Sequence, residues 1–346
     1  MKKTTILIVL LVVFGLVGAA SGSFVSSDPL EVEDAAAVEA YWTPERMQSA
    51  IPYPMGIDGE PTDPDPAALE TEVDAVPGSS TSSRDGRPSV LLEQEDAADS
   101  PGLQPASASY PFPHTTYWVS TVVYLRYPYV TVGKVFFTKQ TGGNFVCSGS
   151  SVGGRLVLTA GHCVSDGARR FHRNWSFVPA FLNNSRLRGT WTAFQLWTSG
   201  SWHNTGKFCQ DYGFVITNNV GGRKLSQTVG SLGFSWNQNR VKQHWDSFGY
   251  PSTAPWNGLR MVQTGAEWAR NDSPGCSNPT AVGKGSGQRP GSSGGPWIRV
   301  FWPDFGGARN FANGVNSYFY RSQPNGMYSP YFNTAVRNLW NSLRTR

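Results

Sequence analysis

The stretch Thr159-Ala160-Gly161-His162-Cys163 follows a short apolar run, and far downstream the chain reads Gly291-Ser292-Ser293-Gly294-Gly295-Pro296. The first stretch places a histidine beside a cysteine in a turn of small residues. The second places a serine in a glycine-rich loop, whose backbone can turn tightly and present N–H groups to an anion. Asp211 lies between them in the chain, just before the apolar strand-like run 213–217. These residue types, in the order His, Asp, Ser, indicate nucleophilic chemistry at a serine.

Each of the three residues has a distinct expected role. A serine hydroxyl is a weak nucleophile at neutral pH, so Ser293 needs a base, and a histidine suits that role because histidines titrate near neutral pH. His162 is the candidate base. Asp211 is the candidate group that orients the imidazole, since a carboxylate at the start of an apolar strand needs a hydrogen-bonding partner. The backbone N–H groups of Gly291 and Ser293 are the candidate oxyanion hole.

The serine loop alone has other interpretations. A glycine-rich loop can simply be flexible, and Gly-x-Ser-x-Gly also matches the nucleophile elbow of α/β-hydrolases. That fold needs its histidine after the serine, whereas the last histidine here, His244, precedes Ser293. Chain order therefore excludes the α/β-hydrolase interpretation, and the ordered set of three residues favours a catalytic triad.

The first 22 residues are typical of a secretory signal peptide. Two lysines precede the apolar run 6–17, and small residues follow it. The run is shorter than the roughly 20 residues that a membrane-spanning helix needs, so a membrane anchor is the less favoured alternative. We therefore expect a secreted, extracellular protein with no stable membrane insertion after signal cleavage.

The exported chain would retain four cysteines, namely Cys147, Cys163, Cys209 and Cys276. An even number in an exported protein predicts two disulfides, although four cysteines allow three pairings. A Cys147–Cys163 bond would close a short loop and fix the turn that carries His162. Cys209–Cys276 then follows by elimination. The chain contains no Cys-x-x-Cys, and we expect neither a metal nor a cofactor.

Charge divides the chain into two parts. Residues 24–109 carry 18 acidic and 3 basic side chains, a net charge of −15, whereas residues 110–346 carry 6 acidic and 24 basic side chains, a net charge of +18. An acidic arm attracts a basic body, most strongly at low salt. We expect residues 23–109 to be a largely disordered pro-segment that masks the body until it is removed. The alternative is an arm that only adds solubility.

Beyond residue 117 the sequence has the texture of a β protein. Short runs rich in Val, Tyr, Phe and Thr alternate with Gly, Asn, Ser and Pro, which is typical of an all-β barrel or sandwich. Near the C-terminus, apolar residues from Phe332 to Leu343 recur with a helical period and predict one helix with a single packing face. The expected strands lie at 117–124, 133–138, 156–159, 213–217 and 297–301.

Together, the histidine stretch, Asp211-Tyr212-Gly213-Phe214 and the serine loop resemble the trypsin/chymotrypsin-like serine peptidases. Flanking stretches such as Gly249-Tyr250-Pro251 are most similar to the bacterial V8-like, or glutamyl endopeptidase-like, branch. The resemblance covers about residues 117–343. It implies a catalytic domain at 110–346 built of two perpendicular antiparallel β-barrels, the first at about 110–225 and the second, with the closing helix, at 226–346.

The chain departs from the family at residues that govern activation and specificity. Ser292 stands where trypsin-like members have an acid that pairs with the new N-terminus, so activation must work differently. Gly287 stands where those enzymes carry an aspartate at the pocket floor, and Asn316 where glutamyl-specific relatives carry a histidine. Neither specificity is therefore expected. Ser317 resembles the serine that hydrogen-bonds the catalytic aspartate, and Asn316, Ser317 and Tyr318 are the candidate substrate-binding residues.

These observations favour an exported serine endopeptidase made as a zymogen, which hydrolyses peptide bonds through His162, Asp211 and Ser293. The alternative is a non-catalytic protein of the same fold that binds anionic polymers through its basic body. The expected partners are protein or peptide substrates and the chain's own acidic pro-segment. Contact with anionic polymers should be weak because the basic residues are scattered singly. We expect a monomer.

Overall fold

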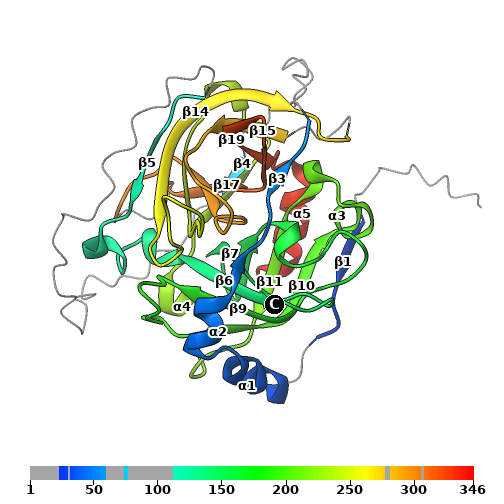
Figure 1. Cartoon of the computed structure of the whole chain (residues 1–346), viewed down its shortest axis with the longest axis vertical. Helices are drawn as coiled ribbons and strands as arrows, with labels where there is room; N and C mark the ends of the chain where they lie inside the picture. The colour runs from blue at the N-terminus through cyan, green and yellow to red at the C-terminus, as the bar shows by residue number, and fades with distance from the viewer. Residues whose placement is uncertain (1–22, 30–31, 60–73, 77–111, 277–280, 305–307) are drawn as a thin grey trace, which may run out of the picture.

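The computed structural model describes residues 23–29, 32–59, 74–76, 112–276, 281–304 and 308–346. The expected signal peptide, residues 1–22, lies outside these ranges, as does most of the arm beyond residue 59. Among the helices in these ranges, none is both long enough and apolar enough to cross a membrane. The body consists of two β-sheets, one below the other in the view of Figure 1, and a helix at the C-terminus.

The first sheet closes into a six-stranded barrel because β10 pairs with β11 on one side and with β9 on the other. All pairings within the barrel are antiparallel. Its interior is filled by aliphatic and aromatic side chains such as Val135, Leu158 and Phe177, which are fully buried. In chain order the barrel strands are β6 (Val132–Thr138), β7 (Asn144–Ser151), β8 (Leu156–Thr159), β9 (Arg173–Pro179), β10 (Trp191–Ser199) and β11 (Gly213–Thr217).

The second sheet is built around the long strand β14, which pairs with β13, with β15 and, at its start, with β5. The hydrogen-bonded order is β18-β19-β15-β14-β13-β16-β17-β12, with β12 joining β17 in parallel. Its strands are β5 (Thr115–Trp118), β12 (Gly233–Trp236), β13 (His244–Gly249), β14 (Val262–Asp272), β15 (Ala281–Gly285), β16 (Pro296–Arg299), β17 (Phe311–Val315), β18 (Tyr318–Tyr320) and β19 (Gln323–Pro330).

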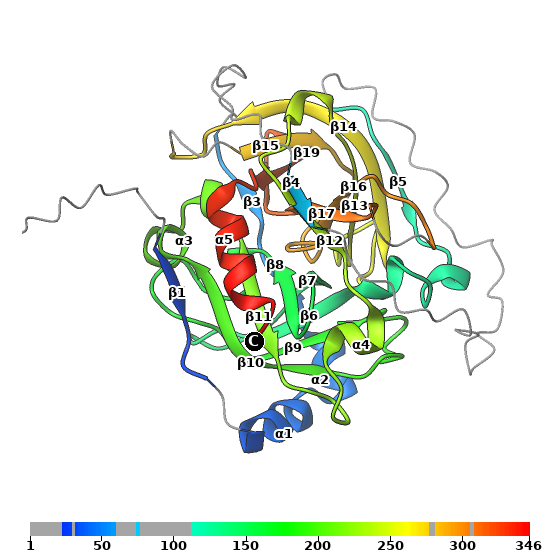
Figure 2. The ribbon, with the colours of Figure 1, turned by 180° about the vertical axis from the view of Figure 1, so that it is seen from behind.

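The C-terminal helix α5 (Thr334–Leu343) joins the two sheets. Asn333 caps its first turn by accepting hydrogen bonds from two backbone N–H groups. The Trp340 ring stacks on Phe234 of β12, with ring centroids 4.7 Å apart. The indole N–H of Trp340 donates to the carbonyl of Val152, just after β7 of the barrel. Figure 2 shows α5 lying alongside both sheets, so its single apolar face contributes to both parts of the body.

Residues 23–29 and 32–59 belong to the arm that was expected to be largely disordered, but they are ordered on the surface of the body. The difference arises because their apolar side chains are buried against the body rather than against one another. Trp42 is 1% exposed, its ring centroid lies 5.4 Å from that of Phe136, and its indole N–H donates to the Asn174 carbonyl. The elements are β1 (Phe24–Ser26), α1 (Val32–Tyr41), α2 (Pro44–Ser49), β2 (Ile51–Pro52) and β3 (Gly56–Ile57).

These elements dock on both sheets. β1 pairs with β10 of the barrel, and β2 pairs in parallel with β7. β3 pairs in parallel with β18 of the second sheet. Figure 1 shows the blue chain from α2 to β3 passing from the lower sheet to the upper one. Further along the arm, β4 (Asp74–Val76) pairs with β12.

The expected all-β fold with a C-terminal helix is confirmed. Four of the expected strands correspond to β6, β8, β11 and β16, although β16 ends at Arg299, two residues before the expected end. The strand expected at 117–124 is shorter, because β5 ends at Trp118 and a 3₁₀ turn (Thr121–Val123) follows. β5 also belongs to the second sheet, although residues 110–225 were assigned to the first barrel. The remaining helices of the described body are α3 (Gly200–Thr205) and α4 (Leu225–Val229).

Trp340→Ala tests the role of α5. The substitution removes a buried ring that contacts both sheets, so the free energy of unfolding should fall by about 3–5 kcal/mol. Urea denaturation followed by tryptophan fluorescence measures the change. Asn338→Ala, on the exposed side of the same helix, should change it by no more than about 0.5 kcal/mol. Equal effects of the two substitutions would contradict the packing role of Trp340.

Candidate active site

Asp211 is a buried carboxylate that orients His162. It follows a 3₁₀ turn (Phe208–Gln210) and precedes β11, whereas His162 lies in the turn after β8. Asp211 Oδ1 accepts the backbone N–H of His162 at 2.7 Å, and Oδ2 pairs with His162 Nδ1 at 2.7 Å. Both side chains are almost fully buried. The backbone and ring bonds together fix the orientation of the imidazole and leave its Nε2 facing away from the carboxylate.

A third hydrogen bond reaches Asp211 from the second sheet. Ser317 precedes β18, and its hydroxyl donates to Asp211 Oδ2 at 2.5 Å. The hydrogen bonds compensate the buried carboxylate for its lost hydration, because hydrogen bonds to a charged group are roughly twice as strong as neutral ones. The carboxylate is therefore held by donors from both halves of the body.

Ser293 lies in the loop between β15 and β16, opposite the histidine turn. The loop needs glycine at two positions. Gly291 has a φ of +102°, and a Cβ there would lie 2.7 Å from the Tyr250 carbonyl oxygen. Gly294 has a φ of +78°, and a Cβ there would lie 2.1 Å from Thr159 Oγ1, beside the histidine turn. Glycine thus permits both the left-handed backbone and the close approach of the two sheets.

The backbone N–H groups of this loop differ in their hydrogen bonds. Those of Ser292 and Gly294 donate to the carbonyls of Arg289 and Asn316. Within the described part of the chain, no hydrogen bond uses the N–H of Gly291 or of Ser293. These two donors stand on either side of Ser292, and they remain available to an oxygen atom bound next to Ser293 Oγ.

Both disulfides lie close to this arrangement. Cys147–Cys163 joins β7 to the residue after His162, and Cys209–Cys276 joins the turn before Asp211 to a residue beyond β14. These are the two pairings expected from the sequence. Cys147, His162 and Cys163 also bring their potential ligand atoms within 4.8 Å of one another, but both sulfurs are bonded to each other and offer no thiolate to a metal.

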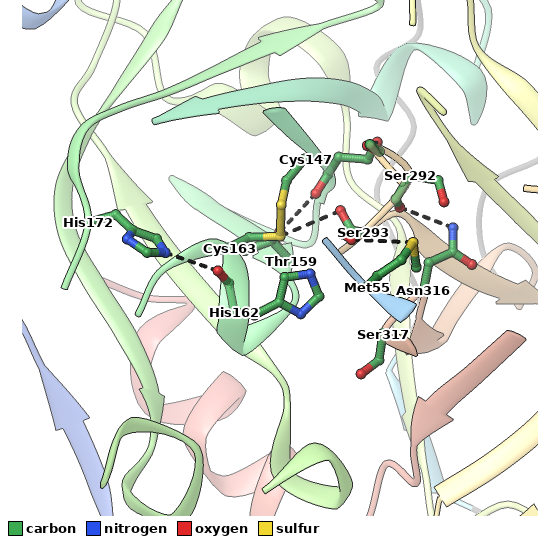
Figure 3. The surroundings of a disulfide bond; sticks show 12 residues. Met55, Cys147, Thr159, His162, Cys163, His172, Ser292, Ser293, Asn316 and Ser317 are labelled. Carbon is green, nitrogen blue, oxygen red and sulfur yellow. Dashed lines mark hydrogen bonds between the residues drawn. A yellow bond between two sulfur atoms is a disulfide. The ribbon is translucent and has the colours of Figure 1, made fainter. Parts of the chain in front are cut away.

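Residues 51–57, which we call the strap, cross the space between Ser293 and His162. The Tyr53 ring stacks on the His162 imidazole, with ring centroids 5.2 Å apart and planes at 27°. Met55 Sδ lies 3.6 Å from Ser293 Oγ, as Figure 3 shows. At one end Tyr53 N–H donates to the Val146 carbonyl, and at the other Phe319 N–H donates to the Met55 carbonyl. The strap is therefore fixed to both sheets and covers the two residues.

Beneath the strap, no hydrogen bond joins His162 Nε2 to Ser293 Oγ in the described residues. Within the described residues, the buried Nε2 of His162 has no hydrogen-bonding partner. The Ser293 hydroxyl faces the Met55 sulfur instead. Burial raises the pKa of Tyr53 to about 12, and the Asp211 carboxylate adds to that rise. The phenol is therefore neutral at physiological pH and covers the imidazole as an uncharged ring.

The three candidate substrate-binding residues are all buried. Asn316 donates through its amide to Phe248 O, Gln288 Oε1 and Ser292 O, and it accepts from the Trp297 indole. Tyr318 donates its hydroxyl to Asp272 at 2.7 Å. Ser317 donates to Asp211. Their side-chain polar groups are thus hydrogen-bonded within the body. The contact between β18 and the strap is made by the backbone, through the hydrogen bond from Phe319 N–H to the Met55 carbonyl.

The sequence predictions missed Tyr53 and Met55. The signal was present, because Ile51-Pro52-Tyr53-Pro54-Met55 is an apolar stretch inside an acidic arm. Apolar residues in such a segment need a partner surface if they are to be buried. The overall composition of the arm concealed this short stretch.

A scan of family models and a search of curated proteins gave no match to the chain. Solved structures do resemble it. Protease Anisep from Arthrobacter nicotinovorans is 35% identical, with a TM-score of 0.57, over 63% of this chain and 96% of that one. The thermostable serine protease AL20 from an extremophilic microorganism is 36% identical, with a TM-score of 0.56, over 62% of this chain and 97% of that one.

A Glu endopeptidase is 17% identical, with a TM-score of 0.54, over 67% of this chain and 97% of that one, and it supports the fold alone. The identity to the first two proteases is high enough, over nearly their whole length, to indicate common descent. The chain therefore belongs to the trypsin/chymotrypsin-like family of serine proteases.

Proposed function

We propose that the protein is an exported serine endopeptidase synthesised as a zymogen, with His162, Asp211 and Ser293 as its catalytic triad. The observation that carries the proposal is the buried Asp211 carboxylate, which binds His162 through both the backbone and the ring and receives Ser317 from the opposite sheet. A histidine with a purely structural role does not need a carboxylate held in this way. It also does not need to lie opposite a serine loop in which two backbone N–H groups make no hydrogen bond.

The proposed reaction proceeds through an acyl-enzyme. Ser293 Oγ attacks the carbonyl carbon of a peptide bond while His162 Nε2 takes its proton, and the N–H groups of Gly291 and Ser293 stabilise the resulting oxyanion. His162 then gives the proton to the leaving amine, and the C–N bond breaks. Water, deprotonated by His162, attacks the acyl-enzyme, and Ser293 regains its proton as the acid leaves. Asp211 stabilises the imidazolium during both halves.

The zymogen part of the proposal rests on the strap. Tyr53 covers the base and Met55 covers the nucleophile, so a substrate can reach Ser293 only after the strap has moved. The contacts are mainly apolar and backbone contacts. An ion pair joins Asp58, the residue after the strap, to Arg321, the residue after β18, but both side chains are exposed, and such pairs stabilise little. We therefore propose steric blocking in place of the electrostatic masking expected from the charges.

Export is supported by residues that require an oxidising compartment. Two disulfides join all four cysteines, and the expected signal peptide at 1–22 would direct the chain out of the cell. Peptides and proteins outside the cell would then be the substrates.

Tyr53→Ala should open the site in the full-length chain. Loss of the ring that stacks on His162 removes buried apolar area and weakens the binding of the strap to the body. The strap then leaves the site more often, so the rate at which a fluorophosphonate labels Ser293 should rise at least about tenfold. Gln48→Ala, at an exposed position of α2, should leave the rate unchanged. Raising the salt concentration should change the wild-type rate less than about twofold. A large acceleration by salt alone would instead support electrostatic masking.

Substitutions in the opened Tyr53→Ala chain test the triad. We expect a single fluorophosphonate adduct on Ser293, which Ser293→Ala abolishes together with peptide hydrolysis, while Ser292→Ala in the same loop retains both. Asp211→Asn should lower kcat by about 10⁴-fold, because the imidazole is no longer held in the required tautomer. Intact-mass spectrometry and peptide assays provide the measurements. An opened, folded chain without any adduct would favour the non-catalytic, polymer-binding alternative.

A further inference from the structure

Met55 is buried although it belongs to a segment that crosses the surface of the body. Its side chain is 1% exposed. It joins a buried apolar cluster of the second sheet, against which Phe319 and Trp268 also pack, and whose other members are Trp245, Val282, Trp297, Met327 and Tyr331. Figure 3 shows Met55 beside Ser293, with Asn316 on its other side and Ser317 below it in the view. The second sheet therefore provides an apolar recess next to the nucleophile, and Met55 fills it.

The recess lies where a substrate side chain would have to bind. A residue whose carbonyl carbon is attacked by Ser293 must place its side chain within a few ångströms of Ser293 Oγ. Met55 Sδ lies 3.6 Å from that oxygen. The recess that holds Met55 is thus the space that the side chain of the residue before the cleaved bond would enter.

Met55 occupies the recess without offering its own peptide bond for cleavage. Its carbonyl oxygen accepts a hydrogen bond from Phe319 N–H at 3.1 Å. In the described residues, the N–H groups of Gly291 and Ser293 make no hydrogen bond, so they do not hold this carbonyl. The atom that faces the nucleophile is a thioether sulfur, which a serine cannot acylate. The side chain can therefore remain in place in the uncut chain.

The polar groups around the recess leave little for a charged side chain. Asn316 already engages its amide with three acceptors and its oxygen with Trp297. Two buried cations pack on rings of this cluster. Lys284 Nζ donates to the Thr264 carbonyl and lies 5.3 Å from the centroid of the Trp297 ring, and the guanidinium carbon of Arg240 lies 4.0 Å from the centroid of the Tyr331 ring. Burial lowers the pKa of Lys284 to about 7, which indicates surroundings that disfavour charge.

We propose that the recess beside Ser293 selects an uncharged, apolar side chain of about the size of methionine, and that Met55 is its built-in occupant until the strap is removed. The proposal rests on the proposed function, because it assigns the substrate class of the same site. It excludes a preference for cleavage after basic or acidic residues.

Substitutions of Met55 in the full-length chain test which side chains the recess accepts. The readout is the rate of fluorophosphonate labelling of Ser293 by intact mass, and it requires a folded site. Met55→Leu should stay within about threefold of wild type, because its volume and polarity are similar. Met55→Glu and Met55→Lys should label at least about tenfold faster, because a buried unpaired charge drives the strap out. Gln48→Glu, which adds a carboxylate at an exposed position of α2, should have no effect.

If Met55→Glu labels as slowly as wild type, the recess accepts an acid, with Lys284 as its partner, and the proposal is wrong. The same outcome with Met55→Lys would indicate a basic preference and would equally overturn it.

Peptide cleavage by the Met55→Gly chain, whose recess is empty, provides the second measurement. Peptides that differ only in the residue before the cleaved bond should show kcat/KM values for Met and Leu at least about tenfold above those for Glu and Lys. Cleavage preferentially after Glu or Lys, with normal labelling of Ser293, would overturn this inference alone. Failure of every opened variant to label or to cut would overturn the proposed function itself.

Discussion

The buried carboxylate of Asp211 is the constraint on which the rest of the site depends. A fully buried charge is stable only if hydrogen bonds replace its hydration. Here two of the donors come from His162 on the barrel and one from Ser317 beside the second sheet. The two sheets must therefore keep one relative arrangement, because a shift of either would leave the charge without full compensation. The same bonds that stabilise the carboxylate fix the imidazole next to Ser293.

Other features of the body keep the sheets in this arrangement. Trp340 of α5 packs on the second sheet and donates to the Val152 carbonyl just after β7 of the barrel. The Cys209–Cys276 bond links the turn before Asp211 to a residue beyond β14. Gly294 lets the serine loop approach Thr159 more closely than any other residue could. The strap adds a further bridge, because it is hydrogen-bonded to both β7 and β18.

Individual strands and the C-terminal helix could be predicted from the sequence, because the spacing of apolar residues along a short segment determines them. β8 and β11 are compact apolar runs, and the stripe from Val336 to Leu343 has a helical period, so each was identified with nearly correct ends. The triad candidates followed from their order in the chain. The docking of the arm could not be predicted this way, because Trp42 packs on Phe136 and Met55 contacts Ser293, which are both more than 90 positions away in the chain. The commitment of Asn316 to the interior likewise depends on partners from three separate segments.

The covalent link between strap and body has a consequence for activation. While the chain is continuous, the strap competes with substrate at a fixed effective concentration that dilution cannot lower. A cut anywhere between residue 59 and the body would remove that advantage but none of the contacts of β1, Trp42 or Met55. The severed arm would remain bound as a separate ligand, released only as fast as those contacts break. Activation would then have two stages, and the onset of activity after the cut would depend on protein concentration.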